Sequence, residues 1–320
     1  MLPDGRRIGA HLPLGHGMVR AVDRAVEIGA TALQVFSDNP TAWRRRSLPP
    51  AELPAFRDRL EEAGILPIAI HGPYLLNLAS PDDTVRRRSI DLLAHELEIA
   101  PTFGARFLNI HLGSHLGSGI DTGIERFGAS VAAALDLVPE ADDPAVLVLE
   151  NSAGSGDTLG STLDELARIV DSVERNGVER SRIALCLDTA HAWGAGMPVG
   201  DPAGVDEVLA VVDRRIGLSR VAMVHLNDSR AEAGSRADRH EHLGGGRIGL
   251  SGLRRILTHP GLAHAMYVLE TPGMDEGYDA INVARAVAIA EGRPLDPLPA
   301  GAFRLRGGRR GTAPADEVAT

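Results

Sequence analysis

The feature that most constrains the fold is an alternation of short apolar runs with longer amphipathic stretches, repeated eight times along the chain. Runs that are apolar on both faces and separated by helical patterns are typical of a parallel sheet covered by helices. Eight such units in roughly 300 residues predict an α/β fold of the (β/α)8 barrel type. The predicted strands span 8–10, 32–36, 66–70, 107–110, 146–149, 183–187, 221–224 and 266–269, and the predicted helices 18–28, 51–63, 84–103, 123–137, 162–175, 202–216, 250–257 and 278–291.

The alternative to a barrel is a doubly wound open sheet. No G-x-G-x-x-G follows the first strand and no G-x-x-x-x-G-K-[ST] occurs, so the barrel is favoured and no nucleotide cofactor is expected. After residue 291 the periodic pattern gives way to a segment rich in Gly, Pro and Arg. We therefore predict a single barrel domain over residues 1–291 and a disordered tail over residues 292–320.

The composition excludes several kinds of chemistry. All 33 basic residues are arginine, which excludes Schiff-base chemistry on a side-chain amine. Because Cys186 is the single cysteine, a metal ion must be held by His, Asp and Glu. No apolar run approaches the roughly 20 residues of a membrane helix, and the N-terminus lacks an apolar signal segment. We therefore expect a cytoplasmic protein with no membrane partner.

The net charge of −10 argues mildly against a nucleic-acid partner, because such proteins usually carry a basic surface. Three bound divalent cations, which contribute +6, would reduce this charge to −4. The arginine clusters at 44–46 and 86–88 can also create a local positive field, although a solvated loop and a helix face explain them equally well. The total charge therefore leaves a DNA partner open.

A metal-capable side chain follows each of the last six predicted strands. In a barrel these strand ends converge on one rim, where active sites lie. A lone His at a strand end is more often a hydrogen-bonded rim residue, and a lone Asp or Glu is often a helix cap. Six together, with three carboxylates in one cavity, favour bound cations. The six residues are His71, His111, Glu150, Asp188, His225 and Glu270.

The segments after the sixth and seventh strands add three more candidates. In D-T-A-H, His191 lies three residues after Asp188, and the loop after His225 ends in D-R-H, which contains Asp238 and His240. Alone, D-R-H is more often a solvated turn. Nine candidate ligands exceed the needs of one tetrahedral ion and suit two or three. Clustered divalent ions indicate phosphoester hydrolysis, in which a pair activates water and neutralises the phosphate while another steadies the leaving oxyanion.

Seven segments between about residue 8 and about residue 290 resemble the successive signatures of the endonuclease IV family of abasic-site (AP) endonucleases, the deoxyribonuclease IV type. The most specific are D-T-x-H-x-x-x-A-G and H-L-N-D-S followed by G-S-x-x-D-R-H. The resemblance implies a xylose isomerase-like TIM barrel that holds three zinc ions and acts as a monomer. It also implies cleavage of the phosphodiester 5′ to an abasic site in duplex DNA, leaving a 3′ hydroxyl, in base excision repair. The segments are IGAHLPLGHGMVRAVDRAVEIGA, IHGPYLLNLASPD, LNIHLGSHLGSG, LENSAG, CLDTAHAWGAG, VHLNDSRAEAGSRADRHEHLGGGRIG and LETPG.

The resemblance also implies roles for individual residues. Glu150 would bridge two ions and, with Glu270, be catalytic. His11 and His115 would support the ligands or contact phosphate, with rim hydrogen bonds as the alternative, and Asn227 and Asp228 would orient ligands or shape the third site. Zinc is the expected metal, with manganese possible at one or more sites. One ion would be completed by His71 and His111, the second by Asp188, His225 and Glu270, and the third held by His191, Asp238 and His240.

The family inserts side chains from the loops after strands 2 and 3 into the DNA, where the abasic nucleotide is flipped out. Tyr74 in HGPYL matches the inserted tyrosine. Thr41 stands at the position of the inserted arginine, and the nearest arginines are those at 44–46. Leu112 also stands where the family commonly has proline. These departures put the DNA affinity and the exact substrate in question more than the chemistry.

Two other functions fit part of the pattern. Sugar isomerases and epimerases share the barrel and a similar metal rim, but they use one or two ions and have no need of the triad of His191, Asp238 and His240. A non-catalytic protein that only binds damaged DNA is disfavoured by the complete ligand set. The triad is therefore the discriminating feature.

Overall fold

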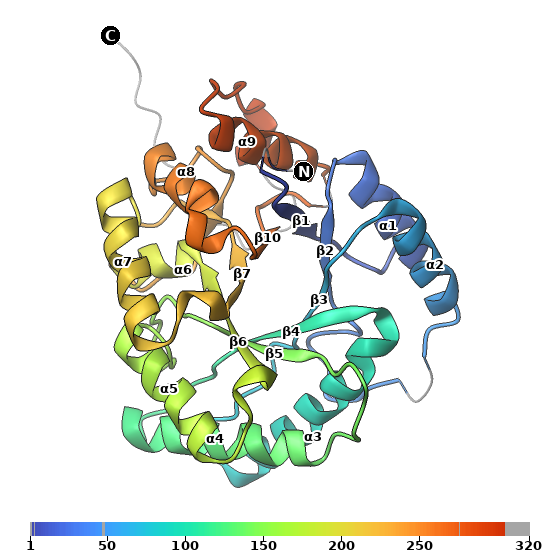
Figure 1. Cartoon of the computed structure of the whole chain (residues 1–320), viewed down its shortest axis with the longest axis vertical. Helices are drawn as coiled ribbons and strands as arrows, with labels where there is room; N and C mark the ends of the chain where they lie inside the picture. Colours follow the sequence, from blue (N-terminus) through green and yellow to red (C-terminus); the bar gives the residue numbers. More distant parts are fainter. Residues whose placement is uncertain (1, 3, 47–48, 275, 305–320) are drawn as a thin grey trace.

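Eight parallel strands close on themselves into a barrel, in the order β1-β10-β7-β6-β5-β4-β3-β2 (Figure 1). The computed structural model describes residues 2, 4–46, 49–274 and 276–304. The predicted (β/α)8 barrel is confirmed within these residues. Its strands are β1 (Arg7–His11), β2 (Ala32–Val35), β3 (Ile68–His71), β4 (Ala105–His111), β5 (Val146–Glu150), β6 (Ile183–Asp188), β7 (Val221–His225) and β10 (Met266–Leu269).

Helices surround the barrel on its outer side, as Figure 1 shows. The helix predicted over 84–103 ends at Ile99 and continues as a 3-10 turn, Ala100–Phe103, because Pro101 has no N–H with which to extend the α-helical pattern. The helices are α1 (Met18–Glu27), α2 (Leu53–Ala63), α3 (Asp83–Ile99), α4 (Ile120–Asp136), α5 (Leu163–Arg175), α6 (Thr189–Gly194), α7 (Pro202–Arg215), α8 (Leu250–Thr258) and α9 (Asp279–Glu291).

The core has two parts. The larger packs the outer faces of the strands against the helices, and the smaller fills the interior of the barrel. Parallel strands covered in this way are apolar on both faces, which is why β2 and β3 are buried along their whole length. The interior cluster consists of Ala32, Ala69, Val148, Ala184, Cys186, Met223, Met266 and Val268. Apart from Gln34 and Asn109, which are buried within β2 and β4, the polar side chains of the site lie at or after the strand ends.

Three short elements near the rim were not expected from the sequence. Helix α6 begins directly after β6, and the Asp188 side chain caps it by accepting a hydrogen bond from the His191 amide. Strands β8 (Asp228–Ser229) and β9 (His240–Glu241) pair antiparallel. Elements this short leave no periodic pattern to read. Their effect is to return His191 and His240 to the rim.

The chain continues past α9 as a segment over residues 293–304. The guanidinium of Arg285 donates to the Asp296 carbonyl, and Nε2 of the buried His242 lies 3.0 Å from the Ala302 carbonyl oxygen. These contacts differ from the disordered tail predicted from residue 292, because buried side chains bind the backbone there. The rest of the predicted tail, residues 305–320, lies outside the described residues.

Candidate metal centre

The ligand candidates lie at the carboxyl ends of the strands. Parallel pairing places His111 opposite Glu150, and Asp188 opposite His225, at the last positions of neighbouring strands. Glu150, Asp188 and His225 are fully buried. Because one residue at the end of each strand faces the same rim, the register alone brings these side chains together.

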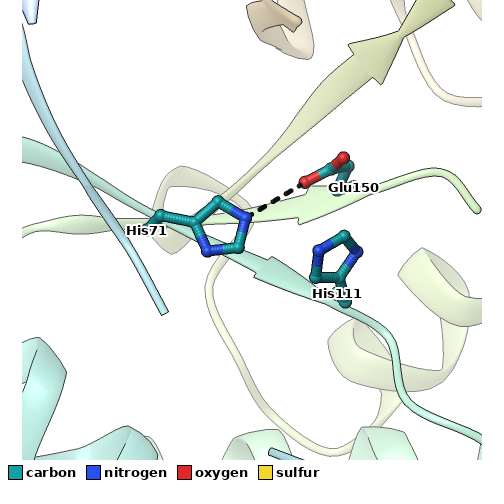
Figure 2. Close-up of side chains that lie close together, drawn as sticks. All are labelled: His71, His111 and Glu150. Carbon is teal, nitrogen blue, oxygen red and sulfur yellow. Dashed lines mark ion pairs between the residues drawn. The ribbon is translucent and has the colours of Figure 1, made fainter. Parts of the chain in front are cut away.

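The first group of ligand atoms comes from His71, His111 and Glu150 (Figure 2). These atoms all lie within 4.8 Å of one another, which suits one shared ion. His71 Nε2 lies 3.8 Å from Glu150 Oε2, and Figure 2 shows the His71 ring directed at that carboxylate with His111 beside them. The two imidazole centroids are 5.1 Å apart.

Glu150 also belongs to a second group, with Asp188, His225 and Glu270, whose ligand atoms again lie within 4.8 Å of one another. His225 Nδ1 lies 3.2 Å from Glu270 Oε2 and 3.4 Å from Glu150 Oε1. The Cys186 sulfur also lies within 4.8 Å of ligand atoms of Glu150 and His225. Burial raises the pKa of the Cys186 thiol to about 12, so the thiol is protonated where no ion binds it. Glu150 is common to both groups.

A third group lies on the side of α6 and β9. The ligand atoms of Asp188, His191 and His240 are within 4.8 Å of one another. Asp238 enters from the loop, with Oδ2 lying 3.3 Å from His191 Nε2 and Oδ1 lying 3.2 Å from His240 Nε2. Asp188 stands between the groups, since its Oδ2 is 3.6 Å from His240 Nε2 and 3.9 Å from His225 Nδ1. The structure thus brings together the three residues expected at a separate ion.

Backbone carbonyls orient three of the histidines. Because a carbonyl only accepts, each Nδ1 must carry the hydrogen, and each Nε2 is left with a lone pair directed at the ligand groups. His225 is held in the opposite sense, with Nε2 lying 3.0 Å from Gln34 Oε1 and Nδ1 facing the carboxylates. The Nδ1-to-carbonyl pairs, at 2.8 to 2.9 Å, are His71 with Gly72, His191 with Asn151, and His240 with Glu270.

Three buried ligand atoms have no hydrogen-bond partner among the described residues: Glu150 Oε1, His225 Nδ1 and His240 Nε2. Buried polar atoms are normally paired, and an unpaired one costs about 1–3 kcal/mol. Divalent cations placed within the groups would accept all three lone pairs. Imidazole nitrogen and carboxylate oxygen are donors that suit zinc and manganese. The residues present therefore fit a metal centre.

The carboxylates of the site require compensating positive charge. Burial opposes the ionisation of Glu150 and Glu270, but nearby histidines, His225 first, outweigh it and hold the pKa of both well below the usual range. Burial likewise opposes protonation of His191, yet the Asp188 charge and its other acidic neighbours raise the pKa of His191 well above its usual value. Divalent cations would neutralise the carboxylates without protonation of the histidines.

Several buried polar residues that the sequence analysis did not single out orient the ligands. Asn109 Nδ2 donates to Glu150 Oε2 at 2.6 Å, and Asn151 Oδ1 accepts from the Asp188 amide at 2.7 Å. Gln34 lies in β2 and contacts the site from below the rim. Gln34 and Asn109 interrupt the apolar runs ALQVF and FLNIH, and that interruption is the signal that could have revealed them.

Asn227 and Asp228 differ in what they contact. Asn227 Nδ2 donates to Asp188 Oδ2 at 2.7 Å, and its Oδ1 accepts from the Glu270 amide at 2.8 Å, so it holds two ligand candidates at once. The buried carboxylate of Asp228 accepts instead from backbone amides in the loop over residues 244–248. Asp228 therefore shapes the loop that follows β9.

The two additional histidines also occupy different places. His11, at the end of β1, has Nδ1 at 3.4 Å from Glu270 Oε1 and lies beside the second group. His115 has Nδ1 accepting from the Gly119 amide at 3.2 Å and Nε2 at 3.9 Å from Asp157 Oδ1. These contacts of His115 join the loops after β4 and β5.

Tyr74 is the most exposed aromatic residue near the ligand groups. It is 59% exposed, and its ring centroid lies 5.9 Å from that of His71. Its amide donates to the Pro40 carbonyl at 3.1 Å, which ties the loop after β3 to the loop after β2. Thr41 is exposed on that second loop. Tyr74 and Thr41 thus lie on adjoining loops at the rim.

The arginines after Thr41 are not equivalent. Arg45 is directed inward, with Nε lying 3.2 Å from Oε1 of the buried Glu96 in α3. Arg46 is exposed and pairs with Asp38 at 3.1 Å. Arg44 is exposed. Arg44 and Arg46 are therefore the two exposed cations of this run, and Arg46 is paired with Asp38.

Comparisons with known proteins agree with this geometry. The family model described as a xylose isomerase-like TIM barrel matches residues 22–292. A protein of Methanoculleus marisnigri named "Probable endonuclease 4" is 40% identical over 283 residues, which cover 88% of this chain and 98% of that relative. The chain therefore spans nearly the whole of a named relative.

Solved structures give the same result. The crystal structure of endonuclease IV from Thermus thermophilus superimposes with a TM-score of 0.77 at 38% identity, covering 89% of this chain and 99% of that one. A D-tagatose 3-epimerase-like protein superimposes with a TM-score of 0.65 at 17% identity, a likeness of fold alone.

Among the described residues, no helix is both long and apolar enough to cross a membrane.

Proposed function

The chain belongs to the endonuclease IV family of xylose isomerase-like TIM barrels, and from this premise we propose that it is a zinc-dependent AP endonuclease of base excision repair. Its reaction is hydrolysis of the phosphodiester 5′ to an abasic site in duplex DNA, which leaves a 3′ hydroxyl. The observation that carries the proposal is the separate third group, in which Asp238 lies 3.3 Å from His191 and 3.2 Å from His240.

The ligand groups suggest which residues hold each of three ions. Glu150 belongs to two of the groups and would hold both ions of a pair, whereas Asp238 faces the third group alone. Zinc is the proposed metal, with manganese as the alternative at one or more positions. We assign the first ion to His71, His111 and Glu150, the second to Glu150, Asp188, His225 and Glu270, and the third to His191, Asp238 and His240.

Such a metal cluster supplies an activated water and positive charge for the phosphate and its leaving oxygen. The protein contributes the placement. Asn109 and Asn227 fix the carboxylates of Glu150 and Asp188 through short hydrogen bonds, so the ligands are held before substrate binds. Glu150, Asp188 and His225 are fully buried, which strengthens the charge interactions among them.

The DNA contacts are proposed on the exposed rim. Tyr74 is placed to stack in the gap left by the missing base. His11 supports Glu270, to which it is 3.4 Å distant, whereas His115 stabilises the neighbouring loops. With Thr41 in place of an inserted arginine, Arg44 is the first exposed cation after Thr41 along the chain. Recognition therefore depends more on Tyr74 here than in a protein with both insertions.

The sugar isomerase alternative predicts a different metal content. An epimerase-type barrel uses one or two ions, and the ligand groups of this chain extend to a third. The likeness to an epimerase-like structure at 17% identity concerns the fold alone. A non-catalytic binder of damaged DNA would have no need of ligand atoms arranged around paired ions.

Cleavage of a duplex with one abasic site tests the proposal. Purified protein is expected to nick the abasic strand on its 5′ side and leave a 3′ hydroxyl, and a strong chelator or Glu150→Gln is expected to abolish nicking. An unsaturated aldehyde end would contradict hydrolysis. Metal analysis supplies an independent arm, since about three ions per chain fits the ligand groups. One ion per chain, together with isomerase or epimerase activity on a sugar, would contradict the proposal.

Two further assignments follow from a DNA substrate. We place the protein in the cytoplasm with the chromosomal DNA, and we expect a monomer because one barrel carries the complete ligand set. Light scattering on the purified protein tests the second assignment, and a stable dimer would contradict it.

A further inference from the structure

Gln34 is the only glutamine in the chain, and it is fully buried in β2. Its carboxamide contacts three side chains of the site at once. Nε2 lies 2.7 Å from Glu270 Oε1 and 3.0 Å from His11 Nδ1, and Oε1 lies 3.0 Å from His225 Nε2. A single carboxamide therefore joins a ligand carboxylate, a ligand imidazole and a neighbouring imidazole.

The Glu270 carboxylate fixes the direction of this amide. An ionised carboxylate can only accept, so the NH2 end of Gln34 must face Glu270. The carbonyl end then faces His225, and His225 Nε2 must carry the hydrogen. This leaves the lone pair of His225 on Nδ1, which lies 3.2 Å from Glu270 Oε2 and has no hydrogen-bond partner among the described residues.

The second N–H of the same NH2 group reaches His11. An N–H on His11 Nδ1 would oppose an amide nitrogen that can only donate, so Nδ1 accepts and the hydrogen lies on Nε2, which is buried and has no hydrogen-bond partner among the described residues. Opposite ends of one amide thus set His11 and His225 to the same tautomer, with the hydrogen on Nε2. The Nδ1 lone pair of His11 accepts a hydrogen bond from Gln34, whereas the Nδ1 lone pair of His225 faces the carboxylates of the site.

We propose that Gln34 is a positioning residue that sets the tautomers of His225 and His11, and thereby presents His225 Nδ1 as a metal ligand. The inference rests on the proposed metal centre. His71, His191 and His240 are oriented by backbone carbonyls, which no substitution removes. His225 is oriented by a side chain, so its tautomer can be changed by mutation.

The variants Gln34→Met and Gln34→Glu separate the two contacts. Methionine has a similar shape but no hydrogen-bonding amide, so both tautomers are released. Glutamate keeps an oxygen toward His225, so His225 keeps its hydrogen on Nε2. It replaces the NH2 group that contacts both Glu270 and His11, so the two carboxylates must share a proton and His11 must move its hydrogen to Nδ1. We expect Gln34→Met to weaken binding of the paired ions about 10- to 100-fold, as removal of a partner that orients a ligand does.

The measurements are histidine 15N shifts in zinc-loaded protein and zinc content under a graded chelator. Expected results are an Nε2–H signature for His225 in the wild type, its loss in Gln34→Met, and an altered His11 signal alone in Gln34→Glu. Ser130→Ala, which removes a buried hydroxyl bonded to the Leu78 carbonyl at 3.0 Å, is the control and should change neither.

Two results would overturn the inference. One is a wild-type spectrum with the His225 hydrogen on Nδ1, which needs no variant to fold. The other is a folded Gln34→Met protein with wild-type zinc affinity. Neither measurement involves DNA cleavage, so failure of the proposed reaction with the expected tautomers present would leave the role of Gln34 intact.

Discussion

His225 Nδ1 lies 3.2 Å from Glu270 Oε2, and this imidazole nitrogen has no hydrogen-bond partner among the described residues. Its other nitrogen is held by Gln34, so the lone pair on Nδ1 faces a carboxylate that also offers only lone pairs. Two acceptors at this distance repel unless a proton or a cation lies with them. The pair therefore requires bound positive charge.

The first prediction concerns metal removal. Chelation is expected to lower the melting temperature, because the buried carboxylates Glu150 and Asp188 lose compensating charge. At free zinc about 1,000-fold above the dissociation constant, each ion contributes about 4 kcal/mol to the free energy of unfolding. Calorimetry with chelator, and again after zinc is restored, measures the effect. An unchanged melting temperature would argue against ions in this cluster.

The second prediction separates the third ion from the pair. Asp238→Asn is expected to lower the metal content by about one ion per chain and to slow cleavage, because Asp238 faces only His191 and His240. Asp157→Asn is the matched control, since it changes a carboxylate of similar exposure, 47% against 50%, outside the ligand groups. Equal metal content in the two variants would contradict the separate site.

Most of the fold could be predicted because its signal is periodic. All eight barrel strands were expected within a few residues of their ends, since each is a short run buried on both faces. Strands β8 and β9 were missed, because two residues carry no period. The segment at 293–304 was expected to be disordered because it is rich in Gly, Pro and Arg. The residues that contact it, Arg285 and His242, lie elsewhere in the chain, and linear spacing does not reveal such contacts.

The site divides in the same way. The nine ligand candidates could be predicted because a barrel brings strand ends together, and the structure places them in three adjoining groups. Asn109 and Gln34 were missed, because each lies inside an apolar run and acts through a ligand on another strand. The inward turn of Arg45 depends on Glu96 in α3, a pairing that linear spacing cannot reveal.

The third prediction concerns the ion pair between Arg45, in the loop after β2, and Glu96 of α3. Glu96 is fully buried, accepts from Ser37 Oγ at 2.6 Å, and lies 3.2 Å from Arg45 Nε. Glu96→Gln leaves a largely buried guanidinium without its counter-charge, and we expect a loss of about 3 kcal/mol in the free energy of unfolding, measured with urea. Arg106→Gln, which breaks an exposed pair with Asp143, should cost at most about 1 kcal/mol. Equal costs would mean that Glu96 is protonated.

The fourth prediction concerns the segment over residues 293–304. Truncation after Gly292 is expected to lower the melting temperature, because Arg285 Nη1 loses the Asp296 carbonyl and His242 Nε2 loses the Ala302 carbonyl as hydrogen-bond partners. Truncation after Arg304 keeps both contacts and is the control. The idea fails if the two truncated proteins melt at the same temperature.

The fifth prediction is a pH dependence at the opposite end of the strands from the metal groups. Tyr267 is fully buried in β10, accepts from Arg6 Nη1 at 3.1 Å and donates to the Ile256 carbonyl at 3.1 Å. Burial raises the pKa of its hydroxyl to about 12, against the opposing effect of Arg6. An unfolded tyrosine loses its proton near pH 10. The stability due to the neutral hydroxyl is therefore complete below about pH 10 and is lost as the pH rises toward 12.

A two-unit difference corresponds to about 3 kcal/mol by pH 12. Unfolding of the wild type and of Tyr267→Phe in guanidinium chloride, from pH 9 to pH 12, measures it as a difference. The chain is suited to this test, because it contains no lysine whose ammonium would titrate in the same window, and Cys186 is common to both proteins. The wild type should lose more stability than the variant across this range, since only the wild type must keep a buried phenol protonated. Parallel curves would show that the Tyr267 hydroxyl ionises in the folded protein as readily as in the unfolded chain.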